Sequence, residues 1–191
     1  MIAGILLAAG AGTRFGGRKL LHPLASGIPI GVAALRNLRA ALPQVVCVVR
    51  RGDDDLRQLL ACEGPDVIEC AQADRGMGHS LAAGVAARGN ATGWVIALAD
   101  MPQIRPETIR AVAHTLEEGA KIVVPVFAGQ RGHPVAFGTV FRGKLLALSG
   151  DAGARAILTE YASDVRELAV DDPGVVQDVD TKADAVQLGG A

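Results

Sequence analysis

The chain has 191 residues, of which half are hydrophobic but only 3% are aromatic, and its formal net charge at pH 7 is −1. Acidic and basic residues are interspersed, which excludes the electrostatic footprint of a protein that binds duplex nucleic acid or an anionic membrane. The length suits one domain, and a core of small aliphatic side chains is typical of helices packed on a sheet. We therefore expect a single domain over residues 1–191 that acts on small molecules.

The cysteines indicate the compartment. Cys47, Cys62 and Cys70 are odd in number and have no CxxC spacing, so they are expected to be free thiols in a reducing environment. The N-terminus lacks a basic segment before an apolar one, and no apolar run approaches about 20 residues. A cytoplasmic location is the expectation.

The order of the elements predicts the fold class. Apolar runs bounded by turn residues predict buried strands over 2–9, 45–49, 67–70, 94–99, 121–126, 133–137 and 165–170. Helical spacing predicts one helix that begins at 29, one that ends near 62, and two more over 81–88 and 106–119. The segment 149–155 introduces a further helix through 161, and a short helix follows 181. This alternation predicts an α/β fold, a three-layer α/β/α sandwich around a mostly parallel, Rossmann-like, doubly wound sheet.

The loop after the first strand is built to hold an anion. Glycines let backbone N–H groups approach an oxyanion, and interleaved cations neutralise its charge. The loop supplies both, with glycines at Gly10, Gly12, Gly16 and Gly17 and cations at Arg14, Arg18 and Lys19. A phosphate chain is the expected ligand, although a glycine turn that only starts a helix would look similar.

Two common phosphate-binding fingerprints do not match this loop. The Rossmann fingerprint needs a third glycine at the sixth position from Gly10, where this chain has Phe15. The Walker loop needs Gly-Lys-Ser/Thr, whereas Lys19 lies between Arg18 and Leu20. The dinucleotide interpretation is weakened and the Walker interpretation fails.

Two aspartates are expected beside this loop. Asp100 follows a fully apolar strand, and Asp180 follows the last extended segment. Ligands of open α/β sheets bind at the carboxyl ends of the strands, and a pair of carboxylates facing phosphates suits Mg²⁺. The residues thus favour metal-assisted phosphoryl or nucleotidyl transfer, although each aspartate could instead cap a helix.

Six segments resemble one family, in the same order along the chain. They are LLAAGAGTRFGGRKL, GMGHSLAAGV, ALADMPQI, GHPVAF, GDAGAR and DVDT. The first resembles the signature loop of the nucleotidyltransferases of molybdenum cofactor maturation, and the others resemble their molybdopterin cytidylyltransferase branch. The resemblance implies a nucleotide-diphospho-sugar transferase-like fold and transfer of CMP from CTP to the terminal phosphate of molybdopterin, with release of pyrophosphate and dependence on Mg²⁺.

The resemblance also implies roles for individual residues. The catalytic residues would be Arg14, Lys19, Asp100 and Asp180, of which Asp100 and Asp180 hold the metal. The nucleotide would contact Leu7, Ala8, Ala9, Gly10, Gly12, Thr13, Arg14, Lys19, Gly76, Met77, Gly78 and Ser80, and the acceptor would contact His133, Pro134, Asp151 and Arg155. Guanylyl-transferring relatives usually have LAGG where this chain has LAAG, so Ala9 favours CTP, because its methyl group narrows the base pocket.

The chain departs from the family pattern at two positions and leaves alternatives open. Ala11 stands where a basic residue is frequent, and Arg18 stands where an acidic residue is common. A sugar phosphate or methylerythritol phosphate could be the acceptor instead. Arg50 and Arg51 could hold the 2′-phosphate of NADP in an oxidoreductase. A non-catalytic carrier that hands the cofactor to a molybdoenzyme would bind CTP but release no pyrophosphate.

Overall fold

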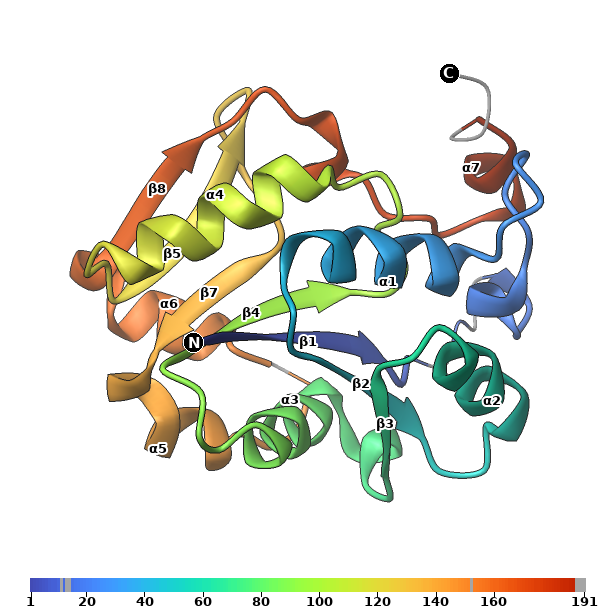
Figure 1. The fold of residues 1–191 in the computed structure, drawn as a ribbon, viewed down its shortest axis with the longest axis horizontal. Helices are drawn as coiled ribbons and strands as arrows, with labels where there is room; N and C mark the ends of the chain where they lie inside the picture. Colours follow the sequence, from blue (N-terminus) through green and yellow to red (C-terminus); the bar gives the residue numbers. More distant parts are fainter. Residues whose placement is uncertain (11, 13–14, 152, 188–191) are drawn as a thin grey trace.

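The computed structural model describes residues 1–10, 12, 15–151 and 153–187. Its strands form one sheet in the order β3-β2-β1-β4-β7-β5-β6, with β8 paired to β5 (Figure 1). The strands are β1 (Ile2–Ala8), β2 (Val45–Arg50), β3 (Asp66–Cys70), β4 (Gly93–Leu98), β5 (Ile122–Phe127), β6 (Gln130–Arg131), β7 (Val135–Gly138) and β8 (Val165–Ala169). Pairing is parallel from β3 to β4 and between β5 and β8, whereas β7 is antiparallel to both of its neighbours. The predicted mostly parallel sheet is confirmed.

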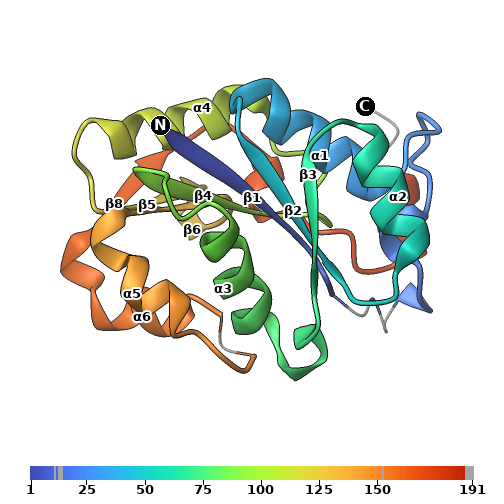
Figure 2. The ribbon, with the colours of Figure 1, turned by 60° about the horizontal axis from the view of Figure 1, so that its bottom comes forward.

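Helices cover both faces of the sheet (Figure 2). The longer ones are α1 (Ile30–Ala41), α2 (Asp54–Cys62), α3 (Met77–Ala87) and α4 (Pro106–Glu117), and the shorter ones are α5 (Arg142–Leu146), α6 (Arg155–Glu160) and α7 (Lys182–Gln187). Helices α1, α2 and α4 pack into one core cluster, and α3, α5 and α6 pack into the other. The three-layer α/β/α prediction is therefore confirmed.

The central strand β1 shows how one sequence serves two cores. Ile2, Leu6 and Ala8 belong to the cluster on the α1 face, whereas Ala3 and Ile5 belong to the cluster on the α3 face. Successive side chains of a strand point to opposite faces, so a strand buried on both sides is apolar throughout. All seven residues of β1 are buried, which explains the continuous apolar run in the sequence.

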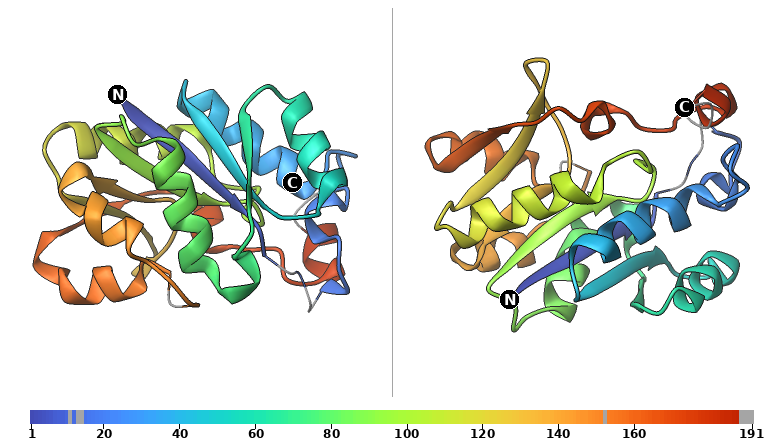
Figure 3. Two further views of the ribbon diagram at one scale, coloured as in Figure 1. Left: turned by 90° about the horizontal axis from the view of Figure 1, so that it is seen from below. Right: turned by 45° about the horizontal axis from the view of Figure 1, so that its top comes forward.

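Several element boundaries differ from the sequence prediction. Helix α3 begins at Met77, four residues earlier than expected, so the segment 77–80 forms its first turn. Helix α5 was not predicted, because its five residues are too few to show a helical period. The helix that the segment 149–155 introduces begins at Arg155, in agreement with the prediction, and ends at Glu160, one residue before the expected Tyr161. Figure 3 shows α5 and α6 on the same side of the sheet as α3.

Candidate active site

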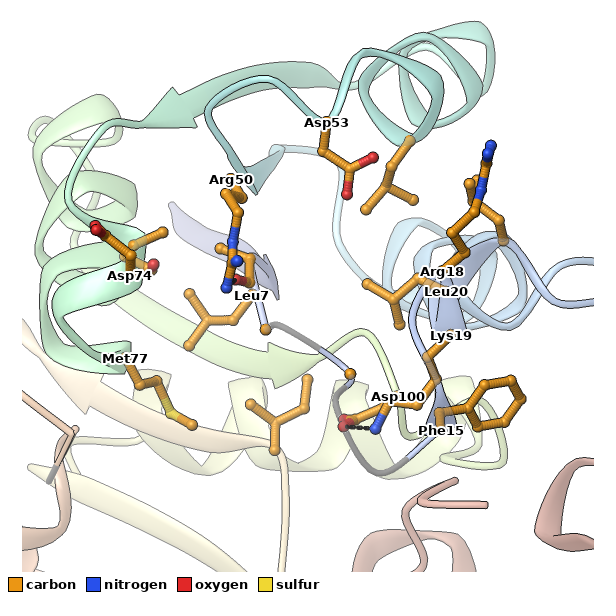
Figure 4. A pocket seen from close by; sticks show the side chains of 18 of the residues that line it. Leu7, Phe15, Arg18, Lys19, Leu20, Arg50, Asp53, Asp74, Met77 and Asp100 are labelled. Carbon is orange, nitrogen blue, oxygen red and sulfur yellow. Dashed lines mark hydrogen bonds and ion pairs between the residues drawn. The ribbon is translucent and has the colours of Figure 1, made fainter. Parts of the chain in front are cut away.

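A cavity of about 570 Å³ opens at the carboxyl ends of β1, β2 and β4. Its lining includes Leu7, Ala9, Gly10, Gly12, Phe15, Arg18, Lys19, Arg50, Asp53, Asp74, Gly76, Met77, Ser80, Asp100, Asp151 and Asp180. Figure 4 shows labelled side chains from the glycine loop, from the end of β2 and from the start of α3 converging on it. This volume falls in the range of small-molecule sites, about 300–1,000 Å³.

One lysine joins the two predicted metal-binding aspartates. Lys19 Nζ lies 2.8 Å from Asp100 Oδ2 and 3.5 Å from Asp180 Oδ1. The lysine side chain is only 11% exposed, so bulk water weakens its attraction to the two carboxylates less than it would at the surface. Residues 80 positions apart therefore share one charged cluster beside the glycine loop, as the topology argument predicts.

Backbone contacts bring the distant Asp180 to this place. Asp100 follows β4 directly, and its carbonyl oxygen accepts a hydrogen bond of 2.9 Å from the Val179 N–H. The Asp184 carboxylate accepts hydrogen bonds from the N–H groups of Asp180 and Thr181, the two residues that precede α7. These bonds hold the pKa of Asp184 below its ordinary value, the backbone bond from Thr181 being the largest cause. The bond from the Asp180 N–H to Asp184 in α7 thus fixes Asp180 facing Lys19.

The donor set fits a hard divalent cation. Mg²⁺ is usually bound by one or two carboxylates together with substrate phosphates and water. Asp100 and Asp180 supply that number of carboxylates, and both line the cavity beside the phosphate-binding loop. Among the described residues no group of three or more His, Cys, Asp or Glu side chains forms a metal site.

Gly78 permits a close approach between the start of α3 and the segment that carries Asp151. Gly78 N–H donates a 2.9 Å hydrogen bond to the carbonyl oxygen of Gly150. A Cβ atom on Gly78 would lie 2.8 Å from the backbone nitrogen of Ser149, closer than real Cβ atoms come. The start of α3 and the segment that carries Asp151 are therefore packed backbone against backbone, and Asp151 reaches the cavity from there.

A second cavity of about 750 Å³ adjoins the first. The two share Leu7, Met77, Leu98 and Asp151 in their walls. The second is lined mainly by aliphatic side chains of the sheet and of α3 and α6, together with Arg131, His133 and Arg155. Three of the four residues assigned to the acceptor by resemblance thus lie around one space next to the phosphate site.

The structure brings most of the predicted site residues together. Leu7, Ala9, Gly10, Gly12, Lys19, Gly76, Met77, Ser80, Asp100 and Asp180 line the first cavity. Ala8 and Gly78 do not: Ala8 faces the core, and Gly78 is covered by Ser149. Pro134 is buried outside the second cavity. Thr13 and Arg14 lie outside the described residues. Arg18 lines the first cavity and its guanidinium pairs with Asp55.

Three charged residues of the first cavity were not predicted as part of the nucleotidyltransferase site. The sequence indicates Arg50 only as a partner for a 2′-phosphate, and it indicates no ligand contact for Asp53 or Asp74. The signal for Arg50 was its position, because it ends the β2 strand next to the strand that carries the glycine loop. No residue pattern in the chain distinguishes Asp74 from a solvated charge.

His133 is a titratable group enclosed beside the second cavity. Its Nδ1 is buried and has no hydrogen-bond partner among the described residues. Burial lowers the pKa of His133, and this effect outweighs a hydrogen bond with the Ile96 backbone and the attraction of Asp100 and Asp178. The imidazole is therefore neutral at pH 7.

The lowered pKa of His133 predicts a pH dependence of stability. Protonation is harder in the folded chain, so the stability present above the unfolded pKa of about 6.5 is lost as the pH falls through the folded value. Replacing His133→Gln should reduce the acid-induced loss in the free energy of unfolding by up to about 1.4 kcal/mol per pH unit in that window, measured by urea unfolding. The exposed His114→Gln variant should follow the wild-type curve; equal slopes for all three proteins would contradict the prediction.

The fold and the site together define a class of protein. A sheet whose carboxyl edge carries a glycine loop, a lysine and two carboxylates in one cavity is the arrangement of a nucleotidyltransferase. The chain matches the MobA-like NTP transferase domain over residues 4–165, and it belongs to that family.

Named relatives extend over most of the chain. Purine catabolism protein PucB from Bacillus subtilis (strain 168) is 31% identical, over 94% of this chain and 92% of PucB. Nicotine blue oxidoreductase from Paenarthrobacter nicotinovorans is 29% identical, over 94% of this chain and 92% of that protein. Bifunctional protein GlmU from Geobacter sulfurreducens is 30% identical over 74% of this chain, which spans only 30% of GlmU.

Solved structures share the fold. The crystal structure of Rv0371c from Mycobacterium tuberculosis H37Rv has a TM-score of 0.86 at 33% identity, over 100% of this chain and 97% of that chain. A manganese complex of Rv0371c has a TM-score of 0.80 at 32% identity, over 100% and 98%. Molybdopterin-guanine dinucleotide biosynthesis protein A from Archaeoglobus fulgidus has a TM-score of 0.68 at 17% identity, over 98% and 96%, a likeness of fold alone.

The helices of the part of the chain described by the structure are too short or too polar to cross a bilayer.

Proposed function

We propose that this nucleotidyltransferase transfers CMP from CTP to the terminal phosphate of a molybdopterin-type acceptor, with release of pyrophosphate. The observation that carries the proposal is the cluster of Lys19, Asp100 and Asp180 in a cavity that adjoins a second, more apolar one. The first cavity suits a nucleoside triphosphate, and the second suits a flat ring system that bears a phosphate. The six-segment resemblance and the family membership support the same reaction.

The reaction is an in-line attack of an acceptor phosphate oxygen on the α-phosphorus of CTP. One P–O bond forms to the acceptor, and the bond to the oxygen that bridges the α- and β-phosphates breaks, so pyrophosphate leaves. A phosphate monoester has a second pKa near 6 and is largely ionised at neutral pH, so the reaction needs no general base. The chain's residues therefore act by positioning the two phosphates and by neutralising charge.

Lys19 is the cation best placed for that neutralisation among the described residues. It lies in the cavity wall against both carboxylates, so its charge is held in place before substrate binds. Asp100 and Asp180 are the residues that would hold Mg²⁺, and the bound ion would supply Lewis-acid stabilisation of phosphate oxygens. The manganese complex of Rv0371c, whose fold this chain shares, supports a divalent cation in this family.

We propose that the second cavity binds the acceptor substrate. His133 and Arg155 would contact the acceptor, and Asp151 lies in the wall common to both cavities. An arginine suits an anionic group of the acceptor, and the aliphatic wall suits a ring. A molybdoenzyme that receives the product in the cytoplasm is the partner we propose.

Thermal shift with CTP, GTP, UTP and ATP, each with and without Mg²⁺, tests the nucleotide. CTP with Mg²⁺ should stabilise the protein most, by about 2.7 kcal/mol when CTP is at 100 times its dissociation constant. Pyrophosphate release should then require a molybdopterin-type acceptor and fail with sugar phosphates and methylerythritol phosphate. Release with one of those acceptors, or binding of CTP with no release at all, would contradict the proposal.

A second candidate is an NADPH-dependent oxidoreductase, which the relative named Nicotine blue oxidoreductase favours. Arg50 lines the cavity where a 2′-phosphate could bind, but Arg51 is exposed and does not. The glycine spacing also departs from the dinucleotide fingerprint. A change in NADPH fluorescence on mixing with the protein would support this candidate over the first.

A further inference from the structure

The end of the first cavity away from Lys19 holds a second arrangement of charges. Figure 4 shows Asp74 and Met77 on the side opposite Lys19 and Asp100, with Arg50 and Leu7 between the two sides. Asp74 forms no ion pair with any other described residue. If the triphosphate lies at the lysine, as the proposed function requires, the nucleoside of the same molecule reaches this end.

Arg50 is short of hydrogen-bond partners. Its Nη2 donates one long bond of 3.3 Å to the carbonyl oxygen of Ala9, and its Nε is buried with no partner among the described residues. A guanidinium carries five N–H donors and no acceptor, and leaving buried donors unmatched is costly. A ligand that presents carbonyl or ring-nitrogen acceptors at this end would complete its bonding.

The Asp74 carboxylate, which lines the same cavity, needs a hydrogen-bond donor where Arg50 needs an acceptor. Asp74 can only accept hydrogen bonds when ionised, so it suits an amino group. Arg50 with Asp74 therefore matches an edge on which an amino group lies beside hydrogen-bond acceptors. Cytosine and adenine have such an edge, whereas uracil lacks the amino group and guanine has an N1–H donor between its amino group and its carbonyl. The Ala9 methyl group, which lines the same cavity, favours the smaller of the two bases.

We propose that Arg50 and Asp74 are the residues that select the nucleobase, Arg50 by donating to the acceptor edge of cytosine and Asp74 by accepting from its amino group. This inference rests on the proposed nucleotidyl transfer, since it assumes that the phosphates bind at Lys19. It assigns specificity to two side chains outside the glycine loop.

Binding of CTP, UTP and inorganic tripolyphosphate, each with Mg²⁺, tests the inference by calorimetry. Arg50→Met should weaken CTP binding by about tenfold to a hundredfold, the usual effect of losing a charge-assisted hydrogen bond, and leave tripolyphosphate binding unchanged. Asp74→Asn should narrow the preference for CTP over UTP by about tenfold, because an amide can donate to the second carbonyl of uracil. Arg51→Met, next in the chain but exposed and outside the cavity, is the matched control.

The outcomes separate this inference from the proposed function. If the wild type binds CTP selectively but both variants keep its CTP-to-UTP ratio, only the inference falls. An equal loss of CTP and tripolyphosphate in Arg50→Met would place Arg50 at the phosphates and also overturn it. If the wild type binds no nucleoside triphosphate, both proposals fall. Should Arg50→Met not fold, Arg50→Lys keeps the charge without the planar fork and is expected to lose CTP affinity as well.

Discussion

Asp100→Asn and Lys19→Met are each expected to slow pyrophosphate release by about 10²–10³, with little effect on folding. Asparagine keeps the shape of Asp100 but removes the charge that holds both Lys19 and the proposed metal ion. Methionine keeps the length of Lys19 but removes the ammonium group that pairs with both Asp100 and Asp180. Steady-state pyrophosphate release, with urea unfolding of the same samples, measures both effects.

The chain supplies a matched control for this experiment. Lys121 Nζ and Asp164 Oδ1 form an ion pair of the same length, 2.8 Å, away from both cavities. Lys121→Met and Asp164→Asn should therefore leave turnover at the wild-type rate, because exposed ion pairs contribute about 0–1 kcal/mol to stability and this one touches no substrate. Near-normal release from Asp100→Asn or from Lys19→Met would refute the assignment of this cluster as the catalytic site.

Gly76→Ala is expected to lower the free energy of unfolding by about 2–5 kcal/mol, the largest stability effect that we predict. Gly76 has a φ of +122°, which only glycine adopts readily. A Cβ atom at this position would also overlap the backbone of Gly150 and Asp151. The substitution would therefore force apart the start of α3 and the segment that carries Asp151. Urea unfolding monitored by circular dichroism measures the loss.

Gly119→Ala separates the two causes of that loss. Gly119 has a φ of +102°, but a Cβ atom there would meet nothing within 4 Å. It should therefore show only the cost of the backbone conformation, about 1–3 kcal/mol. A loss in Gly76→Ala no greater than that in Gly119→Ala would mean that the two segments adjust, and that their contact adds no stability.

The strands of the sheet could be predicted because burial on both faces leaves an unmistakable pattern. All seven residues of β1 are apolar, and Val45–Val49 in β2 forms a similar run. The antiparallel direction of β7 could not be predicted, because apolar content is the same for either direction of pairing. Helix α5 was missed for a related reason, since five residues do not complete two helical turns.

Some residues of the candidate site could be predicted from the sequence, and others could not. The glycine loop, Lys19 and Asp100 could be placed from sequence because a polar residue directly after a buried strand lies at the ligand-binding edge of the sheet. Arg50 satisfies the same rule, but its direction toward Ala9 and its unmatched Nε follow from packing alone. The Asp74 carboxylate is exposed and follows no strand directly, so nothing in its surroundings along the chain indicates a cavity.

The main strands and the longer helices, in their order along the chain, were determined by the amino-acid sequence alone, and so was the expectation of a phosphate ligand at the first loop. Local chemistry suffices there, because burial selects apolar runs and phosphate selects glycines and cations. The backbone bonds that fix Asp180, the shared wall of the two cavities and the placement of Arg50 and Asp74 at one end of the first cavity were decided only by the tertiary structure. Each of these depends on how distant segments pack, and the free energy of that packing comes from contacts that no stretch of chain contains by itself.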